Sequence, residues 1–280
     1  MTLKILQRFK STNGVAYNKS GSGNPIVLVH GVGLRAEAWL LQIEELSKKN
    51  TIYTVDMPGH GYSDLLAGAN ASLEDYVDVI ATWIKEEIQV PVIIIGHSMG
   101  SMIALNFATR YSTLCAGVGA MNSVYRRSNE ASSAVQERAR AMTNNPELDR
   151  VEAPIKRWFK QNGSSYEKNM AELCRSWLEI APAEGYARAY SIFSENNGPD
   201  DKALTEIEVP VIFITGDKDS NSSALMSQQM ASICPYASYA IISDSGHMMQ
   251  MTHPKELNQL LVQFLEKCKN NIEGNKNDHN

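Results

Sequence analysis

Residues 92–108 read Val-Ile-Ile-Ile-Gly-His-Ser-Met-Gly-Ser-Met-Ile-Ala-Leu-Asn-Phe-Ala. The first four are apolar and β-branched, which is typical of a strand that is buried on both faces. Apolar side chains then recur at steps of four from Met99 to Phe107, the spacing of a helix with one buried side. A Gly-x-Ser-x-Gly turn, residues 96–100, joins the two elements. The sequence therefore places the Ser98 hydroxyl at a sharp strand-to-helix corner.

A serine in this position has two interpretations. It could simply cap the N-terminus of the helix after a tight turn. It could also be a nucleophile, in which case an acid and a histidine should follow downstream, each after a later strand. Both follow, because Asp219 and His247 come just after predicted strands at residues 209–215 and 239–242.

Length and composition limit the classes of protein to consider. The chain has 280 residues, of which 43% are hydrophobic, enough for one large α/β domain with an inserted subdomain. The net charge is −5 and no basic patch is visible, so we expect no nucleic-acid partner. No apolar run approaches the ~18 residues that span a bilayer, so we expect no membrane partner. Residues 1–10 lack the apolar core of a signal peptide, which favours a cytoplasmic location.

Strand and helix patterns alternate through most of the chain, which predicts an α/β fold with a mostly parallel, eight-stranded sheet flanked by helices. We expect strands at residues 3–9, 14–18, 26–29, 51–55, 92–95, 115–121, 209–215 and 239–242.

One long segment breaks the alternation. Residues 124–201 are polar and helical in pattern, and are too long for a simple crossover connection. We interpret them as a helical cap inserted into a core formed by residues 1–123 and 202–268. Residues 269–280 are polar and are expected to be disordered.

A second glycine-rich turn, His30-Gly31-Val32-Gly33, follows the predicted strand at residues 26–29. An acyl-transfer serine needs two N–H donors aimed at the developing oxyanion. We expect these donors to be the backbone amides of Met99, directly after the serine, and Val32. The alternative is an ordinary strand-to-helix turn. His30 is expected to hold this loop by hydrogen bonds.

Asp56 and His60 lie in another turn, Asp-Met-Pro-Gly-His-Gly-Tyr-Ser-Asp. Turns of this kind use Asp, Pro and Gly for conformational reasons, so both residues are expected to be structural.

The chemistry explains the choice of histidine. A serine hydroxyl is a weak nucleophile near neutral pH and needs an adjacent base, for which imidazole has a suitable pKa. A carboxylate then fixes the imidazole tautomer. His247 is the best-placed base. The other histidines considered lie inside the turn, at the start of a helix or in the polar tail: His97, His253 and His279. Asp219, Asp217 and Asp244 remain possible acids.

These motifs resemble the α/β-hydrolase superfamily over roughly residues 14–268. They are His30-Gly31-Val32-Gly33, Asp56-Met57-Pro58-Gly59-His60-Gly61, Gly96-His97-Ser98-Met99-Gly100, Gly216-Asp217-Lys218-Asp219 and Gly246-His247. The resemblance implies a Ser98 nucleophile, a His247 general base and Asp219 as the acid. It also implies a small-molecule substrate and no cofactor or metal.

Within the superfamily, the chain looks most like capped enol-lactone hydrolases, carboxylesterases and C–C hydrolases of ring-cleavage products. We expect cleavage of a carboxylic ester or lactone through an acyl-enzyme. C–C hydrolysis is an alternative, although such enzymes usually have a glycine-richer turn after the early strand. A cofactor-free perhydrolase keeps the same three residues. A ligand receptor with a hydrolase pocket is the non-enzyme alternative, and fast turnover of an ester would exclude it.

Candidate substrate-binding residues lie in the cap. Arg126 and Arg127 follow the strand at residues 115–121, where a cation could hold a substrate carboxylate by paired hydrogen bonds. The alternative is that both are solvated residues at a helix start. Further candidates are aromatic and could line a pocket or pack the cap onto the core: Trp158, Trp177, Tyr186 and Tyr190.

Overall fold

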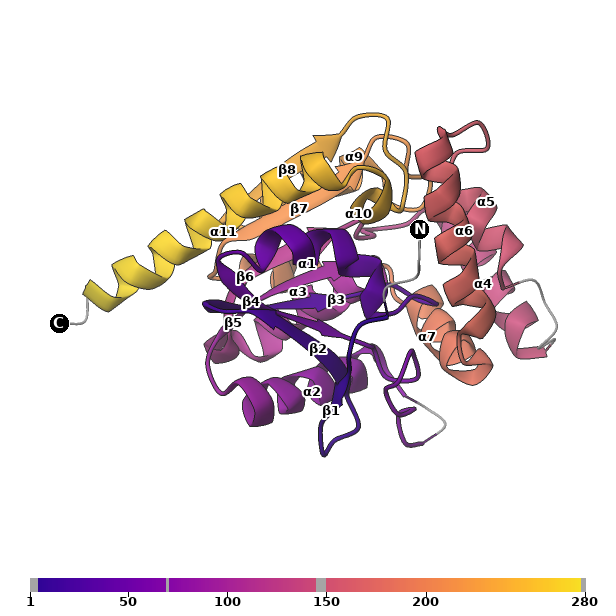
Figure 1. The fold of residues 1–280 in the computed structure, drawn as a ribbon. Coiled ribbons are helices and arrows are strands. Elements are labelled where there is room, and N and C mark those ends of the chain that lie inside the picture. The colour runs from indigo at the N-terminus through magenta and orange to yellow at the C-terminus, as the bar shows by residue number, and fades with distance from the viewer. Residues whose placement is uncertain (1–4, 69–70, 145–149, 278–280) are drawn as a thin grey trace.

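The computed structural model describes residues 5–68, 71–144 and 150–277. Its centre is one eight-stranded sheet with the strand order β1-β2-β4-β3-β5-β6-β7-β8 (Figure 1). The strands are β1 (Phe9–Lys10), β2 (Ala16–Gly21), β3 (Asn24–Val29), β4 (Asn50–Val55), β5 (Val92–His97), β6 (Cys115–Met121), β7 (Val211–Gly216) and β8 (Ala237–Ile242). Strand β2 pairs antiparallel with β1 and β4, and the pairs from β4 to β8 are parallel. The predicted fold class is confirmed.

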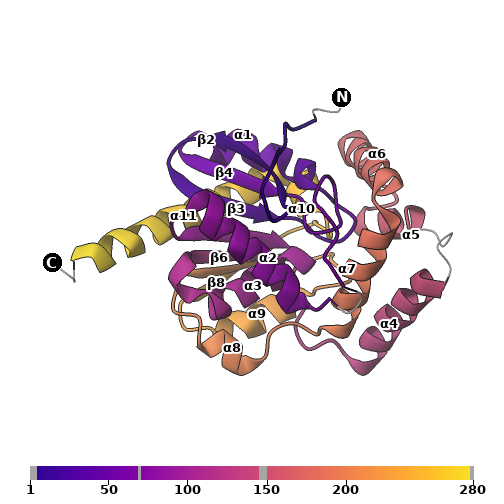
Figure 2. The ribbon, with the colours of Figure 1, turned by 90° about the horizontal axis from the view of Figure 1, so that it is seen from below.

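Helices cover both faces of the sheet (Figure 2). One face packs against α2 (Leu73–Trp83), α3 (Met99–Arg110) and α9 (Ala224–Ile233), and η2 (Ile84–Ile88) extends α2. The other packs against η1 (Ala36–Trp39), α1 (Leu40–Leu46) and α11 (Pro254–Asn277). Consecutive side chains of a strand serve opposite faces, so Val27 and Val29 join the first core while Ile26 and Leu28 join the second.

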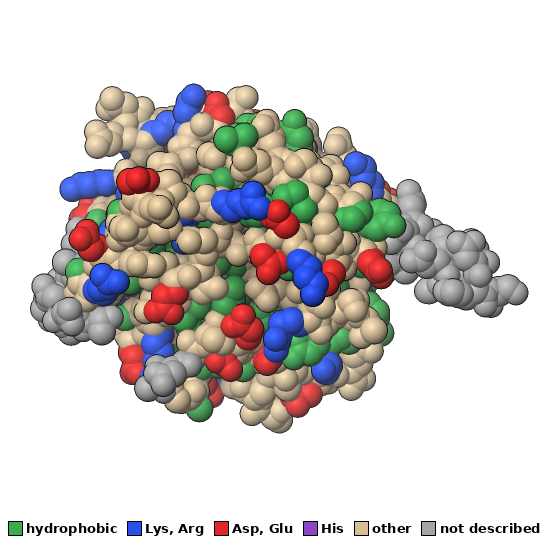
Figure 3. All heavy atoms as spheres, turned by 180° about the vertical axis from the view of Figure 1, so that it is seen from behind, with side chains coloured by type: hydrophobic (Ala, Val, Ile, Leu, Met, Phe, Trp, Pro, Cys, Tyr) green, Lys and Arg blue, Asp and Glu red, His purple; other side chains and the backbone are tan. Residues whose placement is uncertain are grey.

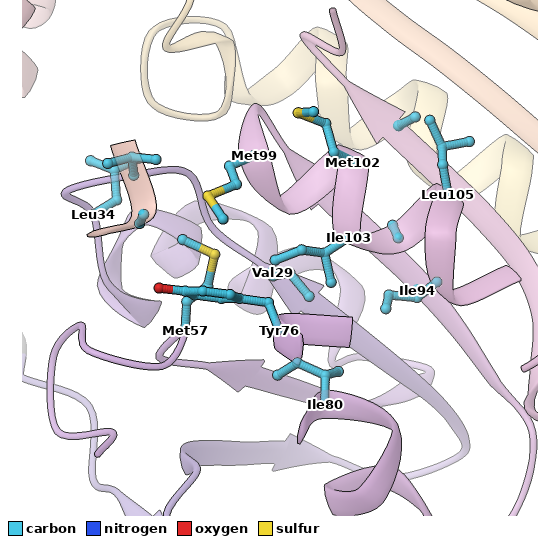
Figure 4. Packing of buried hydrophobic residues seen from close by; sticks show 14 of the residues in the cluster. Val29, Leu34, Met57, Tyr76, Ile80, Ile94, Met99, Met102, Ile103 and Leu105 are labelled. Carbon is cyan, nitrogen blue, oxygen red and sulfur yellow. The ribbon is translucent and has the colours of Figure 1, made fainter. Parts of the chain in front are cut away.

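Helix α3 lies deep in the first core, and Figure 4 shows Met99 beside Met57 and Tyr76. These three side chains are fully buried. The side chain of Met99, the residue after the serine, thus anchors the start of α3 in the core, and its backbone lies at the strand-to-helix corner.

The insert between β6 and β7 is helical, as predicted. It contains α4 (Asn129–Asn144), α5 (Glu152–Trp158), α6 (Ser165–Ile180), α7 (Ala183–Glu195) and the short α8 (Asp201–Thr205). Figure 1 shows α4, α5, α6 and α7 gathered at one end of the sheet. The short η3 (Ser112–Leu114) precedes β6, and α10 (Met249–Thr252) precedes α11.

The expectation of a first strand at residues 3–9 is wrong for residues 5–8. The first strand covers Phe9–Lys10 alone, because the preceding Arg8 is drawn into buried ion pairs with Glu37 and Asp56. Helix α11 extends to Asn277, and the expectation of disorder for residues 269–280 stays a prediction. Residues 3–4 and 278–280 lie outside the described residues. Over the described ranges, no helix combines the length and apolarity needed to cross a bilayer.

Two glycines allow α3 to rest directly on the sheet. A Cβ atom on Gly96 would lie 1.9 Å from the carbonyl oxygen of Gly100, and one on Gly100 would lie 2.2 Å from that of Val29. Both obstacles are backbone atoms, which cannot swing aside as a flexible side chain can.

We therefore expect Gly96→Ala to lower the free energy of unfolding by more than about 3 kcal/mol, an unusually large effect for one methyl group. The matched control is Gly68→Ala, whose Cβ would meet no atom within 4 Å and whose φ of +86° should cost about 1–2 kcal/mol. Urea unfolding at pH 7 measures both. Equal losses in the two variants would contradict the close-packing argument.

Candidate active site

Ser98 occupies the corner between β5 and α3 with φ 55° and ψ −120°. This positive φ is uncommon for a residue with a side chain and is held by the surrounding structure. The Ser98 N–H donates to the carbonyl of Met121 at 2.9 Å, which ties the corner to β6. The Ser98 side chain makes no capping hydrogen bond to α3, so the helix-cap interpretation does not account for it.

His247 lies in the turn after β8 and contacts Asp219 in the turn after β7. The distance from His247 Nδ1 to Asp219 Oδ2 is 2.8 Å, and both side chains are buried. Because a carboxylate accepts, Nδ1 carries the proton and Nε2 is the nitrogen free to act as a base. The other two carboxylates considered are elsewhere. Asp217 is paired with Lys218 and the exposed Asp244 with Lys160.

Three further groups hold the Asp219 carboxylate. Asn122 Nδ2 and Ser222 Oγ donate to Oδ2 at 2.6 and 2.5 Å, and the Asn221 N–H donates to Oδ1 at 2.8 Å. Burial alone would raise the pKa of Asp219. The imidazole of His247 and these hydrogen bonds outweigh burial and bring the pKa well below its usual range. The carboxylate therefore stays ionised near neutral pH.

Sequence reasoning missed Asn122, Asn221 and Ser222. Asn122 had a usable signal, since it directly follows β6 and so shares the edge of the sheet with Asp219.

The loop after β3 lies against the serine, as the oxyanion hypothesis requires. A Cβ atom on Gly31 would lie 3.0 Å from Ser98 Cβ. Within the described residues, the N–H of Gly33 donates to His60 Nε2, whereas the N–H of Val32 has no partner. Met99 is the first residue of α3, so its N–H has no acceptor in the helix. Both expected oxyanion donors are thus available beside Ser98.

Three buried histidines surround this loop in the neutral form. His30 Nε2 accepts from the Met57 N–H at 2.9 Å, and His60 Nε2 accepts from the Gly33 N–H at 3.0 Å. His97 Nε2 lies 2.8 Å from the carbonyl of His247 and therefore donates to it. Burial lowers the pKa of His60 to about 4 and that of His97 to about 3, the latter with a smaller effect of His247. The expectation that His30 and His60 serve the structure agrees with these bonds.

The cap closes over Ser98 and leaves a small cavity of about 30 Å³, roughly the space of one water molecule. Residues of the core and of the cap form its walls: Gly31, Val32, Leu34, His97, Ser98, Asn221 and His247 from the core, and Val135, Arg138, Arg157, Trp158, Tyr186, Tyr190 and Phe193 from the cap. Of the expected cap residues, Trp158, Tyr186 and Tyr190 line it, and the Trp158 ring lies 5.7 Å from that of His247.

Arg126, Arg127 and Trp177 are not among the lining residues. The chain turns at Arg126, where φ is 48°, and its side chain is 63% exposed and paired with Asp201 at 2.6 Å. Arg127 is buried and donates to backbone carbonyls, including that of Asn196 at 2.7 Å. Trp177 is buried in the first core. Their expected role in substrate binding stays a prediction, since these residues lie outside the lining of this cavity.

Val135, Arg138, Arg157 and Phe193 are the lining cap residues that sequence reasoning did not assign to the site. For Phe193 a signal existed, because Tyr186, Tyr190 and Phe193 are spaced by four and three residues along α7 and so share one face.

The buried neutral histidines predict a pH dependence of stability. Between about pH 6.5 and 4 the unfolded chain binds a proton at residue 60 and the folded chain does not, so stability is lost as the pH falls through this window. We expect His60→Gln, whose amide oxygen can still accept from Gly33, to make this loss shallower by up to about 1.4 kcal/mol per pH unit. Urea unfolding at pH 4.5 to 7 tests this, with His253→Gln as the control. An unchanged slope in His60→Gln would show that His60 is not the residue responsible.

Comparisons with known proteins agree with this geometry. The model of the alpha/beta hydrolase family matches residues 26–260. The chain is 39% identical over 267 residues to the (E)-2-((N-methylformamido)methylene)succinate hydrolase of Acinetobacter baylyi, covering 95% of this chain and 99% of that protein. It is 23% identical to 3-oxoadipate enol-lactonase 1 of the same organism, covering 95% of this chain and 97% of the relative.

Among solved structures, a thermophilic esterase from Thermogutta terrifontis with malate bound superimposes with a TM-score of 0.83 at 26% identity, covering 94% of this chain and 99% of that one. The strand order, the helical insert and the family match lead to one conclusion: this chain belongs to the alpha/beta hydrolase family and is a hydrolase.

Proposed function

We propose that the protein is a serine hydrolase that cleaves the acyl bond of a small-molecule carboxylic ester or lactone through an acyl-enzyme on Ser98. The observation that carries this proposal is the buried Asp219–His247 pair, whose histidine lines one cavity with a serine held at positive φ. The enol-lactonase and esterase among the similar proteins support the same bond class. The N-methylformamido group in the name of the 39% identical relative adds an amide as an acyl bond open to the same chemistry.

The first half of the reaction forms the acyl-enzyme. His247 Nε2 takes the proton of the Ser98 hydroxyl as the oxygen attacks the substrate carbonyl carbon. The N–H groups of Val32 and Met99 bind the oxygen that becomes negative. His247 then returns the proton to the leaving oxygen or nitrogen as the carbon–heteroatom bond breaks.

The second half consumes water. His247 takes a proton from a water molecule, whose oxygen attacks the acyl carbon, and then returns a proton to Ser98 as the acid product leaves. Asp219 keeps Nδ1 protonated and stabilises the imidazolium in both halves. Its low pKa ensures that the carboxylate is charged when the imidazolium forms.

Substrate entry requires the cap to move. Pockets for small ligands are commonly about 300–1,000 Å³, and the closed cavity is about 30 Å³. In our proposal, residues 124–201 act as a cap domain that opens for substrate and product and excludes water when closed. The cytoplasmic location expected from the sequence stays a prediction.

Replacing the nucleophile tests the proposal directly. We expect Ser98→Ala to lower the kcat for p-nitrophenyl esters by a factor of at least about 10³, because the oxyanion donors alone supply only residual catalysis. A fluorophosphonate should label the native protein at Ser98. The control is Ser112→Ala, an exposed serine that should retain both activity and labelling. Labelling at another residue, or activity in Ser98→Ala within tenfold of the native protein, would refute the assignment.

A second substitution tests the acid. Asp219→Asn should lower kcat by about 10⁴, because the amide favours the wrong tautomer of His247. Asp217→Asn, two residues away and paired with Lys218 in the described part of the chain, should change kcat less than threefold. Steady-state kinetics on a p-nitrophenyl ester compares the two variants, and the opposite ranking would assign the role to Asp217.

A further inference from the structure

We infer that the substrate carries a carboxylate distant from its acyl bond, and that Arg138 and Arg157 of the cap bind this group. The inference rests on the proposed function for the position of the acyl bond, but the binding site itself is independent of turnover.

The two arginines come from different helices and meet at one cavity. Arg138 lies on α4 and Arg157 on α5, and both line the cavity that Ser98 and His247 line from the core side. Both are partly buried. A substrate whose acyl carbon lies at Ser98 would therefore extend its far end toward two guanidinium groups.

These two cations have no acidic partner among the described residues. Most other arginines of the described chain do have one: Arg8, Arg35, Arg110, Arg126, Arg175 and Arg188. Arg127, beside them, satisfies its guanidinium with oxygens of Phe193, Asn196 and Asn197. Arg140 likewise has no acidic partner among the described residues, but it is exposed and outside the cavity lining, whereas Arg138 and Arg157 lie where a substrate must bind.

The side chains that line the cavity carry a positive charge, although the net charge of the chain is negative. None of its described lining residues is an aspartate or a glutamate. By contrast, the net charge of the chain is −5, and acidic and basic side chains are interspersed over the face in Figure 3. The pKa of Arg127 is lowered to about 10, mainly by burial and to a smaller extent by the charge of nearby Arg138, as expected in a locally positive region.

Arg138 is held in an orientation that suits a carboxylate. Its Nε donates to the hydroxyl of Tyr190 at 3.1 Å. The Tyr190 ring is in turn stacked on Tyr186, with centroids 6.1 Å apart and planes 10° apart. Because Nε is occupied, the two terminal nitrogens remain for a ligand, and they form the pair of donors that binds both oxygens of a carboxylate.

An unpaired, partly desolvated guanidinium favours an anionic ligand over a neutral one of the same shape. The neutral ligand would leave both cations without an anionic partner when the cap closes, and buried polar groups whose hydrogen bonds a ligand fails to satisfy dominate discrimination in such sites. The chemical class that fits is a half-ester of a dicarboxylic acid, or a lactone or amide with an acidic side chain.

The test compares matched substrates with Arg138→Met and Arg157→Met, which keep much of the side-chain length and remove the charge. The substrates are p-nitrophenyl hydrogen glutarate and the neutral p-nitrophenyl butyrate. We expect each variant to lose about ten- to a hundredfold in kcat/KM for the acid, and at least tenfold more for the acid than for the neutral ester. Arg138→Lys should recover part of the loss, because it restores the charge without the paired donors.

Arg140→Met is the matched control, because Arg140 is exposed on the same helix and outside the cavity lining. It should leave both kcat/KM values unchanged. Equal losses on the acid and neutral esters in the Arg138 and Arg157 variants, or no loss on either, would overturn the inference.

A binding measurement separates this inference from the proposed function. Calorimetric titration of Ser98→Ala with glutarate, and with glutaramide as the neutral analogue, requires no turnover. We expect binding of glutarate alone, lost when Arg138→Met or Arg157→Met is added and retained with Arg140→Met. Arginine-dependent binding without ester hydrolysis by the native protein would sustain the inference and overturn the proposed function. Ester hydrolysis with no binding of glutarate would sustain the proposed function and overturn the inference.

Discussion

The structure depends on one close approach of backbone to backbone. Gly96 and Gly100 allow the start of α3 to lie against β5 and β3 at distances that no side chain would permit. Ser98, between them, is forced to a φ of 55° and projects from the carboxyl edge of the sheet. The sheet order places the other groups around it, since β3, β6, β7 and β8 all end at this edge and bring Val32, Asn122, Asp219 and His247 to one place.

The core and the cap have different tasks in this account. The core supplies the groups that make and break bonds, and it fixes them through neutral buried histidines and a carboxylate with four hydrogen-bond donors. The cap supplies aromatic and cationic side chains that choose among substrates. A rigid reaction centre under an exchangeable binding surface explains how one family can contain an enol-lactonase, an esterase and a substituted-succinate hydrolase.

Much of the core could be predicted because its signals are local. Strands ending in Gly-rich turns place reactive residues at one edge, so the proximity of Asp219 to His247 and of Gly31 to Ser98 followed from order along the chain. The cap could not be predicted in this way. Arg126 has the more suggestive position after β6, but a left-handed turn sends it to Asp201, and only tertiary packing brings Arg138 and Arg157 together.

The central claim is that an acyl group passes through Ser98. A direct measurement uses p-nitrophenyl dimethylcarbamate, whose carbamoyl-enzyme loses its group slowly, with rapid quenching and mass spectrometry of the peptides. The account predicts release of one p-nitrophenol per chain, in step with one carbamoyl group on Ser98 and none elsewhere. Continued release of p-nitrophenol with no group attached to the protein, or attachment to a different residue, would contradict it.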